Sequence, residues 1–280
     1  MKTNLDKLLK EENPRISSWI SGELKSLKSR YEEIKAAESP GNYVVLPAND
    51  SHPVDIEVEL KRLYLSPLVG IVQKELGLSL GDNEQGFIGN MNHGQALAVM
   101  SGIESFTMPL YIGVEFLGTL MSGAEGRIKV YNGNGRKISQ KTLEMAFSDI
   151  TEQKNPFRGE LFEDKYSLDS NGKPQNTCSK FNSKGKLIKV TELLDSDTLI
   201  QNRLPGIDLK GWINNPTPHP QGLPRSNVQS GSLYYWQPTE GRVAGFDAVA
   251  DWASLDCDGD PLDSVADLGV RRAKILEKAR

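Results

Sequence analysis

Apolar residues near the start of the chain recur at helical spacing. Between residues 14 and 37 they form one stripe with steps of 4, 4, 3, 4 and 3: Ile16, Ile20, Leu24, Leu27, Tyr31 and Ile34. Pro14 suits a first helical turn, and "SPG" at 39–41 ends the pattern. The stripe predicts an N-terminal helical segment over residues 1–40. It packs either on its own domain or along an oligomerisation seam.

The next hydrophobic patterns alternate between strand and helix. "YVVLP" (43–47) predicts a short strand, whereas residues 55–78 mix periods and assign no single element. A short helix is predicted near Gly94–Ser101, with a break at Gly102 and an extended "SFTMP". A second helix is predicted over Leu110–Met121. Its expected buried face comprises Ile112, Phe116, Leu117 and Leu120.

From residue 128 to 200 the pattern favours hairpins. "YNGNGRKI" (131–138) and "SLDSNGKP" (167–174) place Asn-Gly turn signals between alternating residues, and "FNSKGKLIKV" (181–190) repeats the theme. A loop-rich segment follows at 211–231. The C-terminal part predicts three strands, in "SLYYW", "GRVAGFDAVADWASL" and "ADLGVRRAKI".

Composition excludes several classes of protein. The 280 residues contain no run of 18 apolar residues, so no membrane span is expected, and the first residues lack a secretory signal. We therefore expect a cytoplasmic protein by default, with surface delivery by another route left open. Two distant cysteines make neither a disulfide framework nor a zinc site. The sequence shows no sign of the one-sided basic surface that is typical of nucleic-acid-binding proteins.

The net charge of −4 arises from one short part of the sequence. Seven aspartates fall between Asp247 and Asp267 without a Lys, Arg, Glu or Gln among them, and the other 30 acidic residues face 33 basic ones. Three explanations compete: a calcium loop, a solvated acidic surface, or a strand whose outward residues are free to vary.

A calcium loop fits in part. Asp256, Asp258 and Asp260 stand at positions 1, 3 and 5 of a possible twelve-residue loop, with Ser264 and Asp267 at positions 9 and 12. Position 6 needs a sharp turn that glycine accepts, but it is Pro261, whose ring fixes φ near about −65°. The sequence therefore disfavours an EF-hand.

A strand explains the interleaving of carboxylates with small apolar residues. Side chains alternate between faces, so one face is uniformly small or apolar if a bulge at Asp251-Trp252 shifts the register by one. This inward set is Ala248, Ala250, Ala253, Leu255 and Cys257. The outward set mixes unrelated residue types, which is typical of a rigid inner face carrying an arbitrary outer one.

These residues resemble the variable region of a diversity-generating retroelement target protein, which has a C-type lectin fold of the formylglycine-generating-enzyme type. "GSLYYW" (231–236), "GRVAGF" (241–246) and "GDPLDSVADLGVRRA" (259–273) match its layout, and "NHGQALAVMSGIESFTMPLYIGVEFLGTL" (92–120) is similar to its two-helix element. "NPFRGELFEDKYS" (155–167) matches more loosely. The resemblance covers roughly residues 85–275. This chain departs from the family pattern at two places. It has "SGSLYY" where the family has "GGSW", and it has "LGVRRA" near its end where the family has "IGFRV".

The resemblance implies which residues vary. Such elements randomise adenines, so an AAY codon gives Asp, Ser, Val, Leu, Gly or Tyr but never Lys, Glu, Gln, Met or Trp; Trp252 would need an AGG codon. The expected ligand-binding residues are Asp247, Val249, Asp251, Trp252, Ser254, Asp256, Asp258, Asp260, Leu262, Asp263, Val265 and Asp267.

The sequence contains little that indicates catalysis. The resembling enzymes use a C-terminal cysteine pair or an iron bound by histidines, whereas here only Cys257 lies in that region, and His52, His93 and His219 lack the spacing of a metal pair. No phosphate-binding or nucleophile-elbow motif is present. We expect no catalytic residues, no metal and no cofactor.

The combined expectation is an α+β protein. Residues 41–280 would form a C-type lectin-like domain of mixed antiparallel strands and two helices, with a β-rich insert at about 125–205 and a variable region at about 242–275. The expected function is ligand binding by a non-enzymatic display protein, with a basic or polar macromolecular partner. The alternative is a metal-dependent enzyme or calcium-binding module of the same wider fold family that uses Asp256, Asp258 and Asp260.

Overall fold

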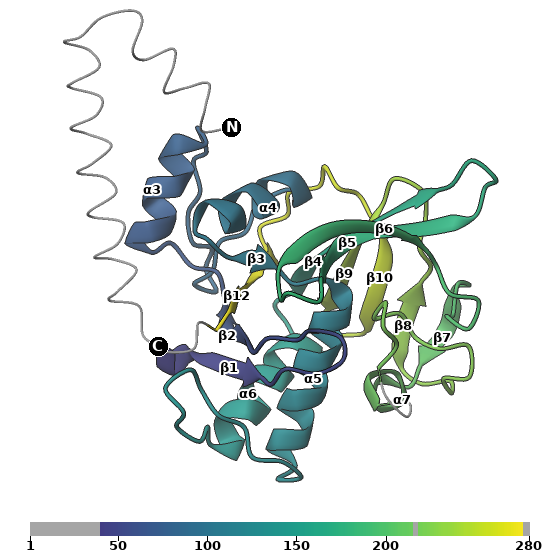
Figure 1. The fold of residues 1–280 in the computed structure, drawn as a ribbon, viewed down its shortest axis with the longest axis horizontal. Coiled ribbons are helices and arrows are strands. Elements are labelled where there is room, and N and C mark those ends of the chain that lie inside the picture. Colours follow the sequence, from purple (N-terminus) through teal and green to yellow (C-terminus); the bar gives the residue numbers. More distant parts are fainter. Residues whose placement is uncertain (1–39, 215–217, 277–280) are drawn as a thin grey trace, which may run out of the picture. The chain divides into compact units, whose positions relative to one another are not determined.

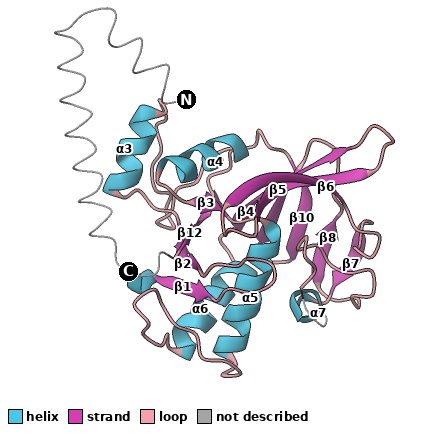
Figure 2. Cartoon of the chain, viewed as in Figure 1, coloured by secondary structure: helices cyan, strands magenta, loops and turns pink. Residues whose placement is uncertain are grey.

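A computed structural model describes residues 40–214 and 218–276 of the chain (Figure 1). The predicted helix at 14–37 lies outside these residues. Beyond a 3₁₀ turn at Pro40–Asn42, the described part is a mixture of helices and mostly antiparallel sheets, so the expected α+β class is confirmed (Figure 2).

The smaller sheet joins the two ends of the described chain. Its order is β1 (Tyr43–Leu46), β2 (Ile56–Arg62), β12 (Arg271–Ile275) and β3 (Phe106–Thr107). β12 pairs antiparallel with both β2 and β3, with Ala273 opposite Val58 and Phe106. The predicted strand at 43–47 is confirmed as β1. The mixed pattern of residues 55–78 resolves into β2 followed by helix α3 (Pro67–Glu75).

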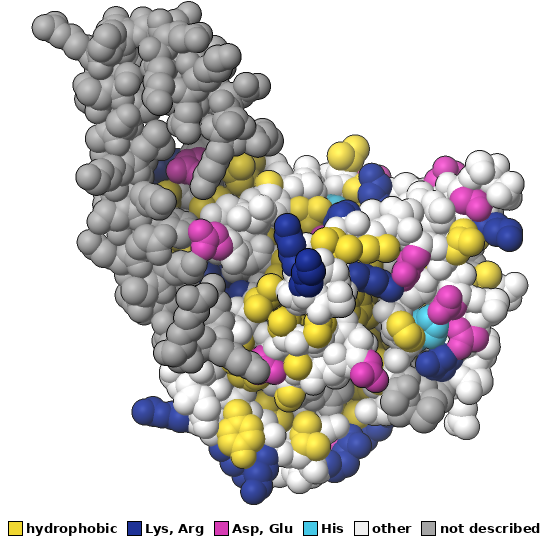
Figure 3. Space-filling view, in the orientation of Figure 1, with side chains coloured by type: hydrophobic (Ala, Val, Ile, Leu, Met, Phe, Trp, Pro, Cys, Tyr) yellow, Lys and Arg dark blue, Asp and Glu magenta, His cyan; other side chains and the backbone are white. Residues whose placement is uncertain are grey.

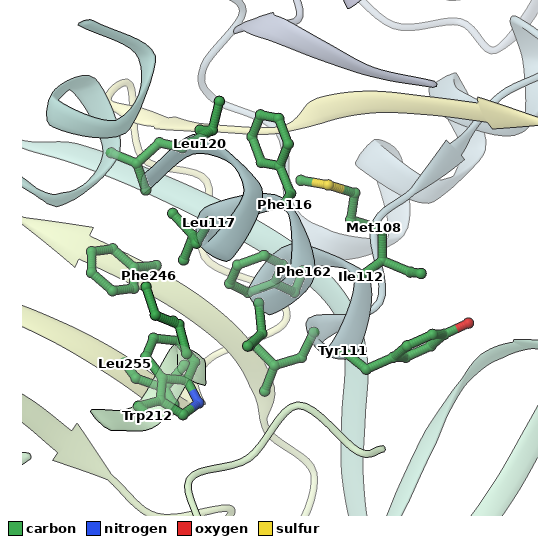
Figure 4. Packing of buried hydrophobic residues seen from close by; sticks show 14 of the residues in the cluster. Met108, Tyr111, Ile112, Phe116, Leu117, Leu120, Phe162, Trp212, Phe246 and Leu255 are labelled. Carbon is green, nitrogen blue, oxygen red and sulfur yellow. The ribbon is translucent and has the colours of Figure 1, made fainter. Parts of the chain in front are cut away.

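The two predicted helices near the centre of the sequence are confirmed. They are α4 (His93–Gly102) and α5 (Leu110–Ala124), with β3 between them. Asn92 and Gln95 form a reciprocal capping box that starts α4. The start of α5 is held from outside the helix, because the Asp164 carboxylate accepts the Leu110 N–H at 2.5 Å. The expected inner face of α5, including Phe116 and Leu117, is buried (Figure 4).

The described residues form three helices besides the two predicted ones, and the longest of the three replaces predicted hairpins. Residues 140–151, inside the stretch predicted as hairpins, form α6 (Gln140–Thr151). Ser139 caps it by accepting the Thr142 N–H, and Leu143, Ala146 and Ile150 bury one side at helical spacing. The Asn-Gly signal just upstream does form a turn, with a bridge between Tyr131 and Lys137.

The larger sheet carries the acidic stretch. Its main path runs β6 (Leu187–Leu193), β5 (Pro174–Phe181), β4 (Arg158–Leu168), β9 (Val243–Ala248), β10 (Ala253–Gly259), β8 (Leu233–Trp236) and β7 (Arg203–Ile207), and β11 (Leu268–Gly269) pairs with β4. A short helix, α7 (Leu209–Asn214), follows β7. The hairpins predicted around residues 167–190 are confirmed as β4–β5 and β5–β6.

The hydrophobic core links α5 to both sheets. It includes Val44 and Val58 from the smaller sheet and Phe162 and Phe246 from the larger one (Figure 4). On the face drawn in Figure 3, acidic and basic side chains of the described residues are interspersed with hydrophobic ones rather than segregated by sign. Core residues therefore cover one face of β9 and β10, and the candidate site lies on their other face.

Candidate functional site

The inward-facing residues of the acidic stretch lie where the alternation predicts. Ala248, Ala253, Leu255 and Cys257 are buried in the core. The predicted bulge at Asp251-Trp252 is wrong, however. β9 ends at Ala248 and β10 begins at Ala253, and the four residues between them make a tight turn closed by the Val249 N–H and the Trp252 carbonyl at 2.9 Å. A hairpin turn also restores the register, so the pattern alone could not separate it from a bulge.

This correction changes the count of C-terminal strands. The region predicted as three strands contains five, because the segment 241–255 holds both β9 and β10, and the last segment divides into β11 and β12. Ala250 lies in the turn and is half-buried rather than part of the inner strand face.

The outer face of the hairpin is less exposed than the sequence suggests. Asp247 lies directly opposite Ser254, and Asp256 follows two residues further along the same face. Ser254 is only 1% exposed, and its Oγ has no hydrogen-bond partner among the described residues. The expectation of an exposed Ser254 is therefore wrong, because the sheet face around it is covered. Asp247 and Asp256 are half-buried.

A small recess of about 130 Å³ gathers several predicted residues. Carboxylates line it from Asp247, Asp256, Asp260 and Asp263. Its apolar walls include Phe157, Leu161, Val265 and Leu268. The sequence did not mark Phe157 and Leu161 as site residues, since they lie about a hundred residues upstream and only the pairing of β4 with β9 brings them there. The recess therefore combines negative charge with apolar surface.

Burial changes the acidity of this recess. Desolvation, with the nearby charge of Asp256, raises the pKa of Asp247 to about 7. Burial also raises the pKa of Asp256, together with the charge of Asp258, against the opposing backbone hydrogen bond from Asp258 and the charge of Arg242. The recess therefore holds carboxyl groups that a cationic ligand would help to ionise.

The loop after β10 is held through its backbone. The Pro261 carbonyl accepts the His93 N–H at 3.2 Å, and the Val265 carbonyl accepts the Asn90 N–H at 2.9 Å. The Ala266 carbonyl accepts from the Asn83 side chain at 2.8 Å. The loop also packs against Gly89, where a Cβ atom would lie only 1.7 Å from the Ala266 oxygen. Main-chain contacts thus hold this loop at Pro261, Val265 and Ala266, and the side chains of Asp260 and Asp267 add contacts of their own.

The loop side chains point into solvent. Leu262 is 78% exposed and Val265 is 42% exposed, and Asp263 and Ser264 are also exposed. Leu262 and Val265 therefore present apolar side chains to solvent.

Other predicted residues contact the scaffold. Asp267 accepts a hydrogen bond from the Gln85 side chain at 2.9 Å. Arg242 lies 3.1 Å from Asp260 and 3.7 Å from Asp258. This arginine was not anticipated as their partner, although it stands only five residues before Asp247. No sequence signal predicts two further features of this region, a contact between aromatic rings and the geometry of the hairpin turn.

One of these is a ring contact. Trp252 stacks on Tyr234 with ring centroids 6.3 Å apart and planes 8° from parallel. The other is the turn itself, which presents Asp251 as an exposed residue and Val249 as a half-buried one. The turn and the 260–268 loop thus carry most of the exposed predicted residues, and the recess carries Asp247, Asp256, Asp260, Asp263 and Val265.

The acidic stretch does not have the architecture of an EF-hand. Asp256 and Asp258 lie on strand β10, and the residues after the loop continue into β11 and β12 rather than into a helix. Two of the carboxylates are used locally: Asp256 accepts the Asp258 N–H at 2.7 Å, and Asp260 accepts the Leu262 N–H at 2.9 Å. These turns orient the carboxylates along the chain.

A different group of possible metal ligands lies elsewhere. Within the described ranges, Asp195, Asp197 and His219 place ligand atoms within 4.8 Å of one another. The His219 Nδ1 accepts the Gln221 N–H at 3.2 Å, so the proton sits on Nε2 and is donated to the two aspartates. Metal binding through Nε2 would break that arrangement, and Arg225 already pairs with Asp197. The group is better explained as a structural hydrogen-bonded cluster.

Neither cysteine is placed for nucleophilic chemistry. Cys257 is fully buried and accepts a hydrogen bond from the Tyr166 hydroxyl at 3.4 Å. Burial raises the pKa of both the Cys257 and Cys178 thiols. Because the thiolate is the nucleophile, thiols with raised pKa values in the core are inert.

Comparisons with protein-family models, with curated proteins and with solved structures found no match for this chain. Among the described helices, none is both long and apolar enough to cross a membrane.

Proposed function

We propose that the chain is a ligand-binding display protein whose C-terminal residues are diversified by a retroelement while its scaffold stays constant. Its described domain would be of the C-type lectin type found in formylglycine-generating enzymes, without catalytic activity. The proposal rests on the resemblance of residues 85–275 and on the way in which the variable positions are held.

The observation that carries the proposal is the separation of backbone from side chains in the 260–268 loop. Pro261, Val265 and Ala266 are anchored through their carbonyl oxygens. Any residue type has this oxygen, so substitution of an exposed side chain preserves the anchoring contact. Leu262 and Val265 meanwhile expose apolar surface. The loop therefore tolerates variation at Leu262, Asp263 and Val265, whereas Asp260 and Asp267 also hold it through their carboxylates.

The strand order supports the proposed fold. β12, from the end of the described domain, pairs with β2 near its start, and α4, β3 and α5 follow in the order that the resemblance implies. A domain closed by its own terminal strands keeps the intervening loops on a rigid base.

The chemistry of the surface favours a ligand that presents both charge and apolar groups. The recess supplies four carboxylates around apolar walls, and Leu262 and the stacked Trp252 lie on the loop and turn of the same stretch. Apolar anchors dominate binding energy, whereas charges mainly steer encounter and select partners. A basic or polar macromolecule fits this combination.

The test of diversification is the DNA around the gene. We expect a second copy of the codons for residues 242–275 that differs only at positions where the copy has adenine, close to a reverse-transcriptase gene. If sequencing of both flanks finds neither, diversification is refuted. Binding is tested separately: a library varied at Asp258, Asp263 and Val265 should yield folded members that bind different proteins.

A further inference from the structure

A second charged arrangement lies where the smaller sheet meets β4 of the larger sheet and helix α6. Three arginines meet two carboxylates where β2, β12 and β4 approach α6. Arg62 Nη1 lies 2.6 Å from Asp149 Oδ2, and Arg271 Nη2 lies 3.1 Å from the same oxygen. Both arginines also place Nε 3.2 Å from Glu160 Oε2. Arg158, at the start of β4, donates to the Glu152 carbonyl.

This network has one more positive than negative charge. Arg62, Arg158, Arg271 and Glu160 are each at most 5% exposed. Glu57, also on β2, pairs with Lys274 at 3.2 Å instead of with this network. Burial of an uncompensated guanidinium is costly, so the arrangement favours an additional anion nearby.

Hydrogen bonding leaves part of this network without partners. Arg62 Nη2 and Arg158 Nε and Nη1 have no acceptor among the described residues. Asp149 Oδ2 and Glu160 Oε2 each serve two arginines, while the other oxygen of Glu160, Oε1, also has no partner among the described residues. Buried donors without a partner are uncommon in folded proteins.

A cavity of about 720 Å³ opens beside this network. Arg62 and Asp149 belong both to the network and to the wall of the cavity, and Lys61 and Lys154 add two more cations to the wall. Lys61 is exposed, whereas Lys154 pairs with Glu152. The apolar part of the wall comprises Leu60, Phe87, Met145 and Ala146. Met145 is 63% exposed although it is a large hydrophobic residue.

We propose that this cavity binds a small organic anion, a carboxylate or phosphate carried on an apolar body. The anionic group would lie toward Arg62 and Lys61, and the apolar body would cover Met145 and Phe87. The volume is within the range typical of small-molecule sites, and a mostly apolar wall with a few charged groups is the usual composition of such sites. No residue of this wall lines the recess of the candidate site, so the inference is independent of the display function.

The test uses the full chain and three probes of similar size: benzoate, phenyl phosphate and uncharged benzamide. At a tenfold excess over its dissociation constant, a bound probe should raise the melting temperature by about 3 °C over sodium chloride of equal ionic strength. We expect this rise with benzoate or phenyl phosphate, and the comparison of the two identifies the preferred anion. Benzamide should have little effect.

Two variants locate the site. Lys61→Glu should weaken binding of the preferred anion at least about threefold, because it reverses a charge on the wall. Lys141→Glu is the matched control: Lys141 is exposed on α6 and does not line the cavity, so affinity should stay at the wild-type value. A methyl NMR spectrum of the wild-type chain, with the Met145 signal assigned from Met145→Leu, should show that signal shifting with the anion.

Several results would overturn the proposal. These are no rise with either anion, an equal rise with benzamide, unchanged affinity in Lys61→Glu, or a Met145 methyl signal that does not move at saturating anion. The NMR measurement needs no charge variant, so it decides the matter even if Lys61→Glu fails to fold.

Discussion

Asp247 on β9 lies directly opposite Ser254 on β10, on a sheet face that is covered rather than free. The Ser254 hydroxyl is buried without a hydrogen-bond partner among the described residues, and the aspartate is half-buried beside the charge of Asp256. This pair is the part of the acidic stretch where the surrounding fold restricts which residue types can be accommodated. It leads to the first prediction.

Replacement of Asp247 by Asn should stabilise the protein above neutral pH. The pKa of Asp247 is raised to about 7, so the folded state binds this proton more tightly than the unfolded state does. The contribution of Asp247 to stability is therefore greatest below pH ~4 and is lost as the pH rises to ~7. At pH 8, Asp247→Asn should increase the free energy of unfolding by about 1–3 kcal/mol, and at pH 4 the gain should vanish.

Urea unfolding at both pH values measures this difference. Asp258→Asn is the control, since Asp258 is exposed and should change stability by less than about 0.5 kcal/mol. Equal effects of the two substitutions would contradict the covered position of Asp247.

Substitution by aspartate should be tolerated at Leu262 but should disrupt the fold at Leu255. Leu262→Asp should alter the free energy of unfolding by under about 0.5 kcal/mol, because this side chain is largely in solvent. Leu255→Asp should unfold the domain or cost more than about 4 kcal/mol, because it buries an unpaired carboxylate in the core. Circular dichroism melts distinguish the two. Similar melts would show that the division into scaffold and display positions is wrong.

Gly89 should be required for the position of the 260–268 loop. Gly89→Ala would place a Cβ atom against the Ala266 carbonyl, which belongs to backbone and cannot rotate away. We expect a loss of about 1–3 kcal/mol, measured by thermal unfolding. Gly94→Ala in α4 meets only a contact at 3.6 Å and should be neutral or stabilising, since alanine favours helix. A neutral Gly89→Ala would mean that the loop does not depend on this close approach.

His52 should make stability depend on pH in the same direction as Asp247, but over a higher pH range. Burial alone would lower the pKa of His52, but the hydrogen bond and charge of Glu115, 3.0 Å away, outweigh it and raise the pKa. The stabilisation is complete below the unfolded pKa of ~6.5 and is lost as the pH rises through the folded value. Glu115→Gln should therefore lower stability at pH 6 more than at pH 9. Equal losses at both pH values would indicate that His52 stays neutral.

Calcium should not stabilise the protein specifically. The carboxylates of Asp256 and Asp260 are oriented by local backbone N–H groups, and β11 follows where a calcium loop would lead into a helix. We expect the same small change in melting temperature from calcium, magnesium or sodium at equal ionic strength, because only screening acts. A rise of several degrees with calcium alone, lost in Asp258→Asn, would restore the calcium alternative.

Short-range pattern was sufficient for much of the fold. The stripe of α5, the capped start of α4, and the Asn-Gly and Lys-Gly turns around β4, β5 and β6 each depend on residues within a few positions of one another. The helix α6 was missed because an Asn-Gly turn beside it suggested continuing hairpins, although Ser139 and the spacing of Leu143, Ala146 and Ile150 are ordinary helix signals. The inner face of β9 and β10 was also predictable, since alternation requires only that one face be apolar.

By itself, the sequence determined which residues of the acidic stretch face the core, because Ala248, Ala253, Leu255 and Cys257 must leave water together. Only the tertiary structure decided which outward residues are free. Phe157 and Leu161 border the recess, and Gly89, Asn90 and His93 hold the loop, through contacts between segments about 90 to 170 residues apart. Alternation assigns a side chain to a face, but burial depends on what covers that face. The coverage of Ser254 and the exposure of Leu262 therefore come from the packing of distant elements.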